Sequence, residues 1–251
     1  MHKSAGGQTA TFWEHLDELR SCIIRSIIVV VIAAIAAFCM KDALFAVVLA
    51  PRSSDFITYR LIGGDDFTLQ LMNIGLTEQF MTHMRVALYA GLLIASPYVL
   101  YQLFGFIAPG LYRQERKAAI WIGASAYLMF IFGTIVDYFL IFPLTVRFLG
   151  TYQVSADVAN MLTLQSYIDT LIGMSFIIGV VFELPVVCAI LARLGIINGE
   201  LMSQYRRHAI IAILIVSAII TPTTDAFTLL VVALPIWLLY EVSIWIVKLK
   251  K

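Results

Sequence analysis

Charged residues are scarce in this chain, and this scarcity decides its class. Lysine, arginine, aspartate and glutamate make up 13% of the 251 residues, while 61% are hydrophobic. Soluble domains carry roughly 25% charged residues. Because no water-soluble core of this size could hide so many apolar side chains, we expect an all-α integral membrane protein, with a single transmembrane domain over residues 1–251.

Other residue types and motifs are also missing. The net charge is only +1, which excludes nucleic-acid binding through a basic field. Cys22, Cys39 and Cys188 show no CxxC or Cys/His spacing, and the four histidines are scattered, so we predict no metal site. No GxxxxGK[ST] phosphate loop is present. We therefore expect no bound cofactor and no nucleotide hydrolysis, so any energy must come from a gradient or a partner.

Long apolar runs are abundant, and they predict six spans. These are residues 22–40, 79–104, 118–142, 166–194, 208–220 and 227–247. The fifth offers only ~20 Å of apolar helix at ~1.5 Å per residue, against a hydrocarbon core ~30 Å thick. It must therefore thin the bilayer locally or be shielded by partners.

The segments between the spans have their own patterns. Phe12–Arg20 places apolar residues at helical spacing between acids, which predicts an amphipathic helix lying at the membrane interface. Ala43–Ala50 is too short to cross and ends at Pro51. Pro97 is expected to kink the second span, and Pro143 to end the third before an external loop over residues 144–165.

Basic residues fix the expected orientation. With six spans both termini share one side, and most basic residues fall on it. That side holds Lys3, Arg20, Arg113, Arg116, Lys117, Arg193, Arg206, Arg207, Lys248, Lys250 and Lys251. Because Lys and Arg accumulate on the cytosolic side, both termini are predicted to be cytosolic.

Polar residues inside the spans are the candidates for function. Glu183 lies near the middle of a span, where a carboxylate costs at least ~2.5 kcal/mol, and Pro185 should bend the helix beside it. The alternative is an acid kept for packing only. Arg85, Asp137, Asp169 and Glu241 lie nearer span ends and are expected to snorkel, with Arg85 able to meet an acid from another helix end. Asp225 is expected to cap the last helix.

Two polar segments face the predicted cytosolic side. Glu18 and Arg20 lie on the amphipathic helix, and residues 106–117, FIAPGLYRQERK, join the second and third spans. Taken alone, both segments fit a solvated helix face and a mixed-charge loop as well as a binding surface.

Several motifs, in order and on the predicted topology, resemble the TatC family, the C subunit of the twin-arginine translocase. They are HLDELR (15–20), LAP (49–51), SPYVLYQLFGFIAPGLY (96–112), FELPV (182–186), TPTTDAF (221–227) and ALP followed by YE near the last span. The resemblance covers residues 13–241. It implies six spans in a cupped-hand arrangement, location in the bacterial plasma (inner) membrane, and recognition of paired-arginine signal peptides. Folded proteins would be exported with the single-span partners TatA and TatB, using the proton-motive force, in an assembly with several copies of the chain and TatB.

The resemblance also implies site residues. The signal-binding set would be Glu18, Arg20, Phe106, Arg113, Glu115 and Arg116, with Glu183 as the intramembrane polar site. Pro51, Pro185, Thr221, Asp225 and Thr228 would be structural or partner-contact residues. The chemistry is sensible, because a carboxylate accepts the planar arginine guanidinium through two parallel hydrogen bonds, which lysine cannot reproduce.

One region departs from the family pattern, and two other functions compete. Thr223 and Thr224 stand where many relatives have a proline-richer turn, and Thr228 and Leu229 stand where a glutamine is common, so the residues of the partner-helix site are open. A proton-coupled transporter using Glu183 would show internal repeats, and none is evident. An intramembrane protease would need a Ser/His pair or two aspartates at matching depth, which the sequence lacks.

Overall fold

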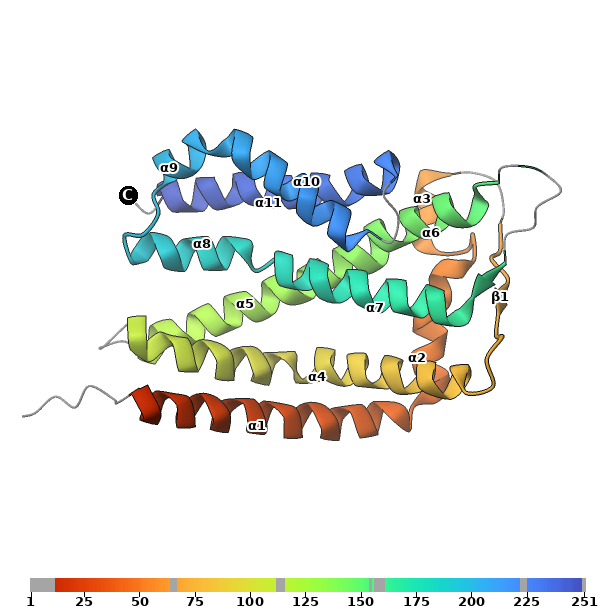
Figure 1. Cartoon of the computed structure of the whole chain (residues 1–251), viewed down its shortest axis with the longest axis horizontal. Helices are drawn as coiled ribbons and strands as arrows, with labels where there is room; N and C mark the ends of the chain where they lie inside the picture. The colour runs from red at the N-terminus through yellow and green to blue at the C-terminus, as the bar shows by residue number, and fades with distance from the viewer. Residues whose placement is uncertain are drawn as a thin grey trace, which may run out of the picture.

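The computed structural model describes residues 12–63, 67–111, 116–153, 155, 161–221 and 225–249, and these are almost entirely helical (Figure 1). The α-helices are α1 (Phe12–Phe38), α2 (Lys41–Val48), α3 (Ile57–Ile62), α4 (Glu78–Leu111), α5 (Arg116–Val136), α6 (Phe142–Thr151), α7 (Leu164–Val181), α8 (Leu184–Arg193), α9 (Gly199–Gln204), α10 (Arg206–Ile220) and α11 (Ala226–Leu249). A 3₁₀ turn, η1 (Ala50–Arg52), and a π-helix, η2 (Asp137–Ile141), complete the helical elements of this described part.

Five helical segments of the described chain are long and apolar enough to cross a membrane. They are Leu16–Phe38, Glu78–Phe106, Ile122–Thr151, Leu164–Arg193 and Ala226–Leu249. These overlap five of the six predicted spans. The remaining predicted span, residues 208–220, corresponds to α10, whose 15 residues make about 22 Å of helix at 1.5 Å per residue. The chain is therefore a multi-pass helical membrane protein with five candidate spans of full length.

The amphipathic segment runs without a break into the first span as one continuous helix, α1, because residues 20–22 contain neither a glycine nor a proline. One predicted boundary is wrong. Pro143 does not end the third span: the helical path continues from α5 through η2 into α6, and residues up to Thr151 are helical instead of an external loop. Pro143 occupies the first turn of α6, directly after the π-helix, where a missing N–H is tolerated.

The helices lie side by side, with α1 packed along α4 at one edge and α10 with α11 at the other (Figure 1). Gly91 on α4 brings the first pair together, since a Cβ at this position would lie 2.5 Å from the backbone nitrogen of Ala34 on α1. The main core forms where α5, η2, α6, α7 and α11 meet, and it includes Phe142, Ile168, Ile178, Val232 and Ile236.

We call the end of the molecule where α1 begins and α11 ends the terminal end, and the other the opposite end (Figure 1). At the opposite end α2 follows the first span, and β1 (Leu71–Met72) pairs in parallel with β2 (Leu162–Thr163). The short helix predicted over residues 43–50 is confirmed as α2 and η1, whereas this two-stranded pairing was not predicted.

Hydrogen bonds from tyrosine hydroxyls hold the segment of α2, η1 and α3 against the long helices. The buried Tyr59 of α3 donates to the carbonyl oxygens of Pro51 at 2.9 Å and Pro143 at 3.0 Å. Tyr138 and Tyr167 donate to carbonyls of α2, those of Val47 at 2.7 Å and Val48 at 3.1 Å. Burial raises the pKa of the Tyr59 phenol above its ordinary value, although the positive charge of Arg147 acts in the opposite direction. Pro51, which is buried in η1, thus belongs to a hydrogen-bonded contact between η1, α3 and α6 and has a structural role.

Candidate functional site

The described parts of the two predicted signal-binding segments lie at the terminal end. Glu18 and Arg20 lie exposed in the second and third turns of α1. Phe106 lies half-buried in the last turns of α4, and because α1 and α4 run antiparallel and in contact, both regions lie at the same end of the bundle (Figure 1). Glu18 and Phe106 each interact with other groups of the protein.

The structure describes only part of the charged segment within residues 106–117. Arg113 and Glu115 lie outside the described residues, and Arg116 is described only by its place as the first residue of α5. The described chain shows the two helices that this segment connects: α4 ends at Leu111 and α5 begins at Arg116. Both of these helix ends lie at the same end of the bundle as the start of α1 (Figure 1).

Glu183 lies at the junction of α7 and α8. The predicted bend at Glu183–Pro185 is confirmed: α7 ends at Val181, α8 begins at Leu184, and the buried Pro185 occupies the first turn of α8. Both carboxyl oxygens of Glu183 are buried, and neither has a hydrogen-bond partner in the described part of the chain. An ionised carboxylate so placed would lack any compensation for lost hydration, so this side chain is suited to be a neutral acid.

Asp137 contradicts its prediction. It was expected to snorkel near a span end, yet it is 0% exposed, because the helical path continues for fourteen residues beyond it, to Thr151. It is the first residue of the π-helix η2, and among the described residues no hydrogen bond reaches either carboxyl oxygen. The polar neighbour is Ser175 of α7, which accepts a 2.7 Å hydrogen bond from the Tyr89 hydroxyl. Sequence reasoning missed this cluster, although an acid inside an apolar run with no basic residue at helical spacing was a usable signal.

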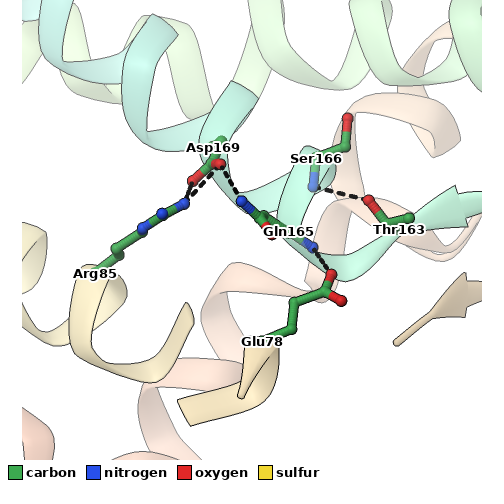
Figure 2. A network of polar contacts seen from close by, with 6 residues as sticks. All are labelled: Glu78, Arg85, Thr163, Gln165, Ser166 and Asp169. Atoms are coloured by element: carbon green, nitrogen blue, oxygen red, sulfur yellow. Dashed lines mark hydrogen bonds and ion pairs between the residues drawn. The ribbon is translucent and has the colours of Figure 1, made fainter. Parts of the chain in front are cut away.

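The opposite end carries a polar network between α4 and α7 (Figure 2). Nη1 of Arg85 lies 2.5 and 2.7 Å from the two carboxylate oxygens of Asp169, which confirms the prediction that Arg85 meets an acid from another helix end. Glu78 accepts the backbone N–H of Gln165 at 3.2 Å, and of Ile74 and Gly75 at 3.1 and 2.9 Å. The network fixes the start of α4 against the start of α7.

The turn between α10 and α11 carries the predicted partner-contact residues. Asp225 accepts the backbone N–H of Thr228 at 2.8 Å and the Thr228 hydroxyl at 2.6 Å, so the predicted capping of the last helix is confirmed. Thr228 is fully buried, and Thr221 is buried at the end of α10. Asp225 and Thr228 thus stabilise the start of α11, and Thr221 and Thr228 present little surface of their own.

Glu241 pairs with another helix instead of extending to the interface by itself. Its Oε2 accepts a 2.7 Å contact from Nη2 of Arg206 at the start of α10. No cluster of three or more His, Cys, Asp or Glu residues that could hold a metal ion occurs in the part of the chain that the structure describes.

Comparisons with known proteins agree with this arrangement. The family model described as "Sec-independent protein translocase protein (TatC)" matches residues 14–235. The TatC of Carboxydothermus hydrogenoformans is 36% identical over 242 residues, covering 96% of this chain and 94% of that relative. The TatC of Aquifex aeolicus is 32% identical, with 94% of each chain covered.

A solved structure gives the same result at the level of the fold. The crystal structure of a twin-arginine translocase receptor, TatC in DDM, superposes with a TM-score of 0.79 at 31% identity, covering 94% of this chain and 100% of the other. The match to the family model, over residues 14–235, includes residues 15–20 and 106–117 at the terminal end. The chain therefore belongs to the TatC family of Sec-independent protein translocases, as a twin-arginine translocase receptor subunit and not an enzyme.

Proposed function

We propose that this chain binds paired-arginine signal peptides at a surface formed by Glu18 and Glu115, with Arg20, Phe106, Arg113 and Arg116 around them. One observation carries the proposal: the exposed Glu18 lies at the same end of the bundle as the junction of α4 and α5, on which Glu115 is located. Two carboxylates on separate segments can each accept one guanidinium through paired hydrogen bonds. The neighbouring basic residues would disfavour cations in other positions by charge repulsion.

The proposed topology has six spans in a cupped-hand arrangement, with α10 as a short fifth span and both termini in the cytosol of a bacterial cell. The distribution of basic residues supports this orientation. Arg193, Arg206, Arg207 and Lys248 all belong to helix ends at the terminal end, as expected for a cytosolic face. The whole chain, residues 1–251, would form one transmembrane domain in the plasma membrane.

TatA and TatB are the proposed partners, and the turn between α10 and α11 is their proposed contact region. α10 is too short to match an unperturbed bilayer, and Ile211, Ile215 and Ile219 on it are exposed. A partner helix packed against that apolar face would cover the three isoleucines. It would also reduce the contact of this short helix with a bilayer thicker than the helix is long. Photo-crosslinking from single positions between 218 and 230 tests this contact, which is refuted if TatA and TatB react no better there than at exposed positions of α1.

The apolar part of the signal peptide is proposed to lie in the membrane towards Glu183, and the proton-motive force to supply the energy for export of folded cargo. The support is the buried, unpartnered carboxyl of Glu183 at the bend between α7 and α8. A Glu183→Gln variant keeps the size of the side chain but cannot exchange a proton. It is expected to bind signal peptide normally and to export folded cargo poorly.

The decisive experiment is binding of a signal peptide to the purified protein in detergent. An Arg-Arg peptide is compared with its Lys-Lys counterpart on the wild type, on Glu18→Ala with Glu115→Ala, and on Asp17→Ala. Asp17 is an exposed acid beside Glu18 on α1 and serves as the matched control. We expect a preference for Arg-Arg that the double change abolishes and the control retains. Equal binding of both peptides to all three proteins would refute the assignment of the two acids.

A further inference from the structure

A pocket at the terminal end plays no part in the proposed signal recognition. It lies between the last turn of α8, the start of α9 and the last turn of α11, and its volume is about 560 Å³. Arg193, Glu200 and Lys248 supply charge to its walls, and Ala192, Ile197 and Val247 supply apolar surface. Ile197 and Ala192 also pack on a small core of Met202, Ile244 and Val247, so the floor of the pocket is part of the folded structure.

The chain builds this pocket by reversing sharply after α8. Gly195 has a φ of +73°, and its N–H donates to the Ala192 carbonyl at 3.1 Å while Ile196 N–H donates to Leu191 at 3.0 Å. This closes the end of α8 in the manner of a Schellman motif. Asn198 then begins α9, its Oδ1 accepting the Leu201 N–H at 2.7 Å. Two capped helix ends thus face the end of α11 across a fixed gap.

Gly199 determines the course of the Lys248 side chain. A Cβ at residue 199 would lie 2.4 Å from Cγ of Lys248 and 3.4 Å from its backbone nitrogen. The aliphatic stem of Lys248 therefore lies flat against the start of α9, and only glycine leaves room for it. The position of this lysine along the pocket wall is set by packing, in contrast to a freely rotating surface lysine.

Arg193 and Lys248 are available for a ligand. Both are exposed, and neither forms an ion pair with any residue that the structure describes. Glu200 lines the same pocket and interacts with another group of the protein. Two cations and one acid give the pocket a net charge of +1, which suits a ligand with a single negative charge.

Exposed apolar residues flank the two basic residues of the pocket along the chain. Trp245, one turn before Lys248 on α11, is 72% exposed, and Leu249 is 75% exposed. Leu194 and Ile196 are exposed beside Arg193. In a membrane protein such residues at the end of a span contact lipid, and tryptophan is enriched at the level of the headgroups. A ligand here would therefore meet positive charge at one side and hydrocarbon at the other.

We propose that this pocket binds an anionic glycerophospholipid, with its phosphate on Arg193 and Lys248 and its acyl chains along Trp245 and Leu249. Basic pockets between membrane helices on the cytosolic side are suited to anionic headgroups. The guanidinium of Arg193 can hold two phosphate oxygens, and Lys248 adds a point charge. This proposal is independent of signal recognition, because it uses neither Glu18 nor residues 106–117.

Native mass spectrometry of the purified protein in detergent tests it, with phosphatidylglycerol, phosphatidylcholine of the same acyl chains, and inorganic phosphate as three separate probes. We expect preferential retention of phosphatidylglycerol. Arg193→Gln and Lys248→Gln should each lower its apparent affinity about fivefold. Arg207→Gln is the matched control, because it removes the same charge at the same end but outside the pocket.

Two further variants distinguish a pocket of defined geometry from nonspecific attraction of the lipid by positive charge at this end of the protein. Gly199→Ala leaves the charge unchanged but displaces the Lys248 stem, so it should weaken lipid binding, whereas Glu200→Gln removes a repelling charge and should strengthen it. Thermal unfolding of each variant establishes that the fold is intact. Equal retention of the two lipids, an equal loss in Arg207→Gln and Arg193→Gln, or competition by inorganic phosphate alone would each overturn the proposal.

Discussion

Arg85 on α4 and Asp169 on α7 are joined by an ion pair across 84 positions of sequence, with one guanidinium nitrogen 2.5 and 2.7 Å from the two carboxylate oxygens. The pair lies where both helices begin, next to the contacts of Glu78 with the start of α7 (Figure 2). It therefore fixes the separation of two spans at the end opposite to the proposed signal-binding surface.

A double-mutant cycle measures the strength of this pair. The side chains are 47% and 44% exposed, so solvent screens the charges and the coupling between Arg85→Gln and Asp169→Asn should be about 0.2–1 kcal/mol. Thermal unfolding in detergent at low and high salt provides the measurement, and the coupling should shrink with salt. The exposed pair Asp55 and Arg60 serves as a reference for a pair within one segment. A coupling of several kcal/mol that ignores salt would show that the pair is buried from solvent in the membrane.

Removal of Asp225 should weaken the start of α11. Asp225→Ala loses the N-cap, which costs about 1 kcal/mol, and leaves the fully buried Thr228 hydroxyl without its 2.6 Å partner. Asp225→Asn retains an acceptor for the Thr228 N–H and should lose less. The apparent melting temperatures of the two variants give the comparison. Equal losses in both would mean that the charge of Asp225, and not its capping geometry, is what matters.

Three local features could be predicted from the sequence, because each depends on a few adjacent residues. They are the capping of α11 by Asp225, the bend at Glu183–Pro185 and the position of α2. Family motifs likewise placed Glu18 and Phe106 at one end of the bundle. Local rules did not suffice at Pro143. A proline is expected to end a helix, but η2 widens the preceding turn and lets the helical path continue into α6.

Contacts between distant segments account for the other differences. The pairing of β1 with β2 joins residues about 90 positions apart, and two-residue strands leave no alternating pattern to detect. The burial of Asp137 depends on α6 and α7 packing around η2, which no spacing within residues 118–142 reveals. The charged loop around Glu115 lies outside the described residues, so its contribution to the site stays a prediction from the family resemblance.

Asp137 should tolerate loss of charge better than gain of volume. Its carboxyl is fully buried, without a hydrogen bond to any described residue, so the neutral form is favoured and Asp137→Asn, of similar size, should leave stability nearly unchanged. Asp137→Glu adds a methylene group at a fully buried position and should cost about 1–3 kcal/mol. Thermal unfolding in detergent distinguishes the two variants. The reverse order, with Glu tolerated and Asn destabilising, would show that an ionised carboxylate is required.

Substitution of Gly91 by alanine should destabilise the protein, whereas the same substitution of Gly105 on the same helix should not. A methyl group at residue 91 would lie 2.5 Å from the backbone of α1, which can move only if the two helices separate. At residue 105 no atom lies within 4 Å of the added carbon. Because alanine favours a helix over glycine by about 0.5–1 kcal/mol, Gly105→Ala should stabilise slightly and Gly91→Ala should destabilise. Limited proteolysis and melting temperature report on α1, and equal effects at the two glycines would contradict the close approach of α1 and α4.

Tyr59→Phe should loosen the joint between η1 and α6, and the loss should depend on pH. The phenol donates to the carbonyls of Pro51 and Pro143, and its removal leaves buried acceptors unpaired at a cost of about 1–3 kcal/mol at neutral pH.

Burial raises the pKa of the Tyr59 phenol in the folded protein, so the folded state binds the phenolic proton more tightly than the unfolded state does. The linked stability is complete below the ordinary tyrosine pKa of about 10 and declines as pH rises above it. The gap in stability between wild type and Tyr59→Phe should therefore narrow in alkaline solution, while Tyr205→Phe, at an exposed ring, should follow the wild type at every pH. A gap that stays constant up to pH values well above 10 would show that the hydroxyl is not protected in the folded state, and that the joint is held by ring packing alone.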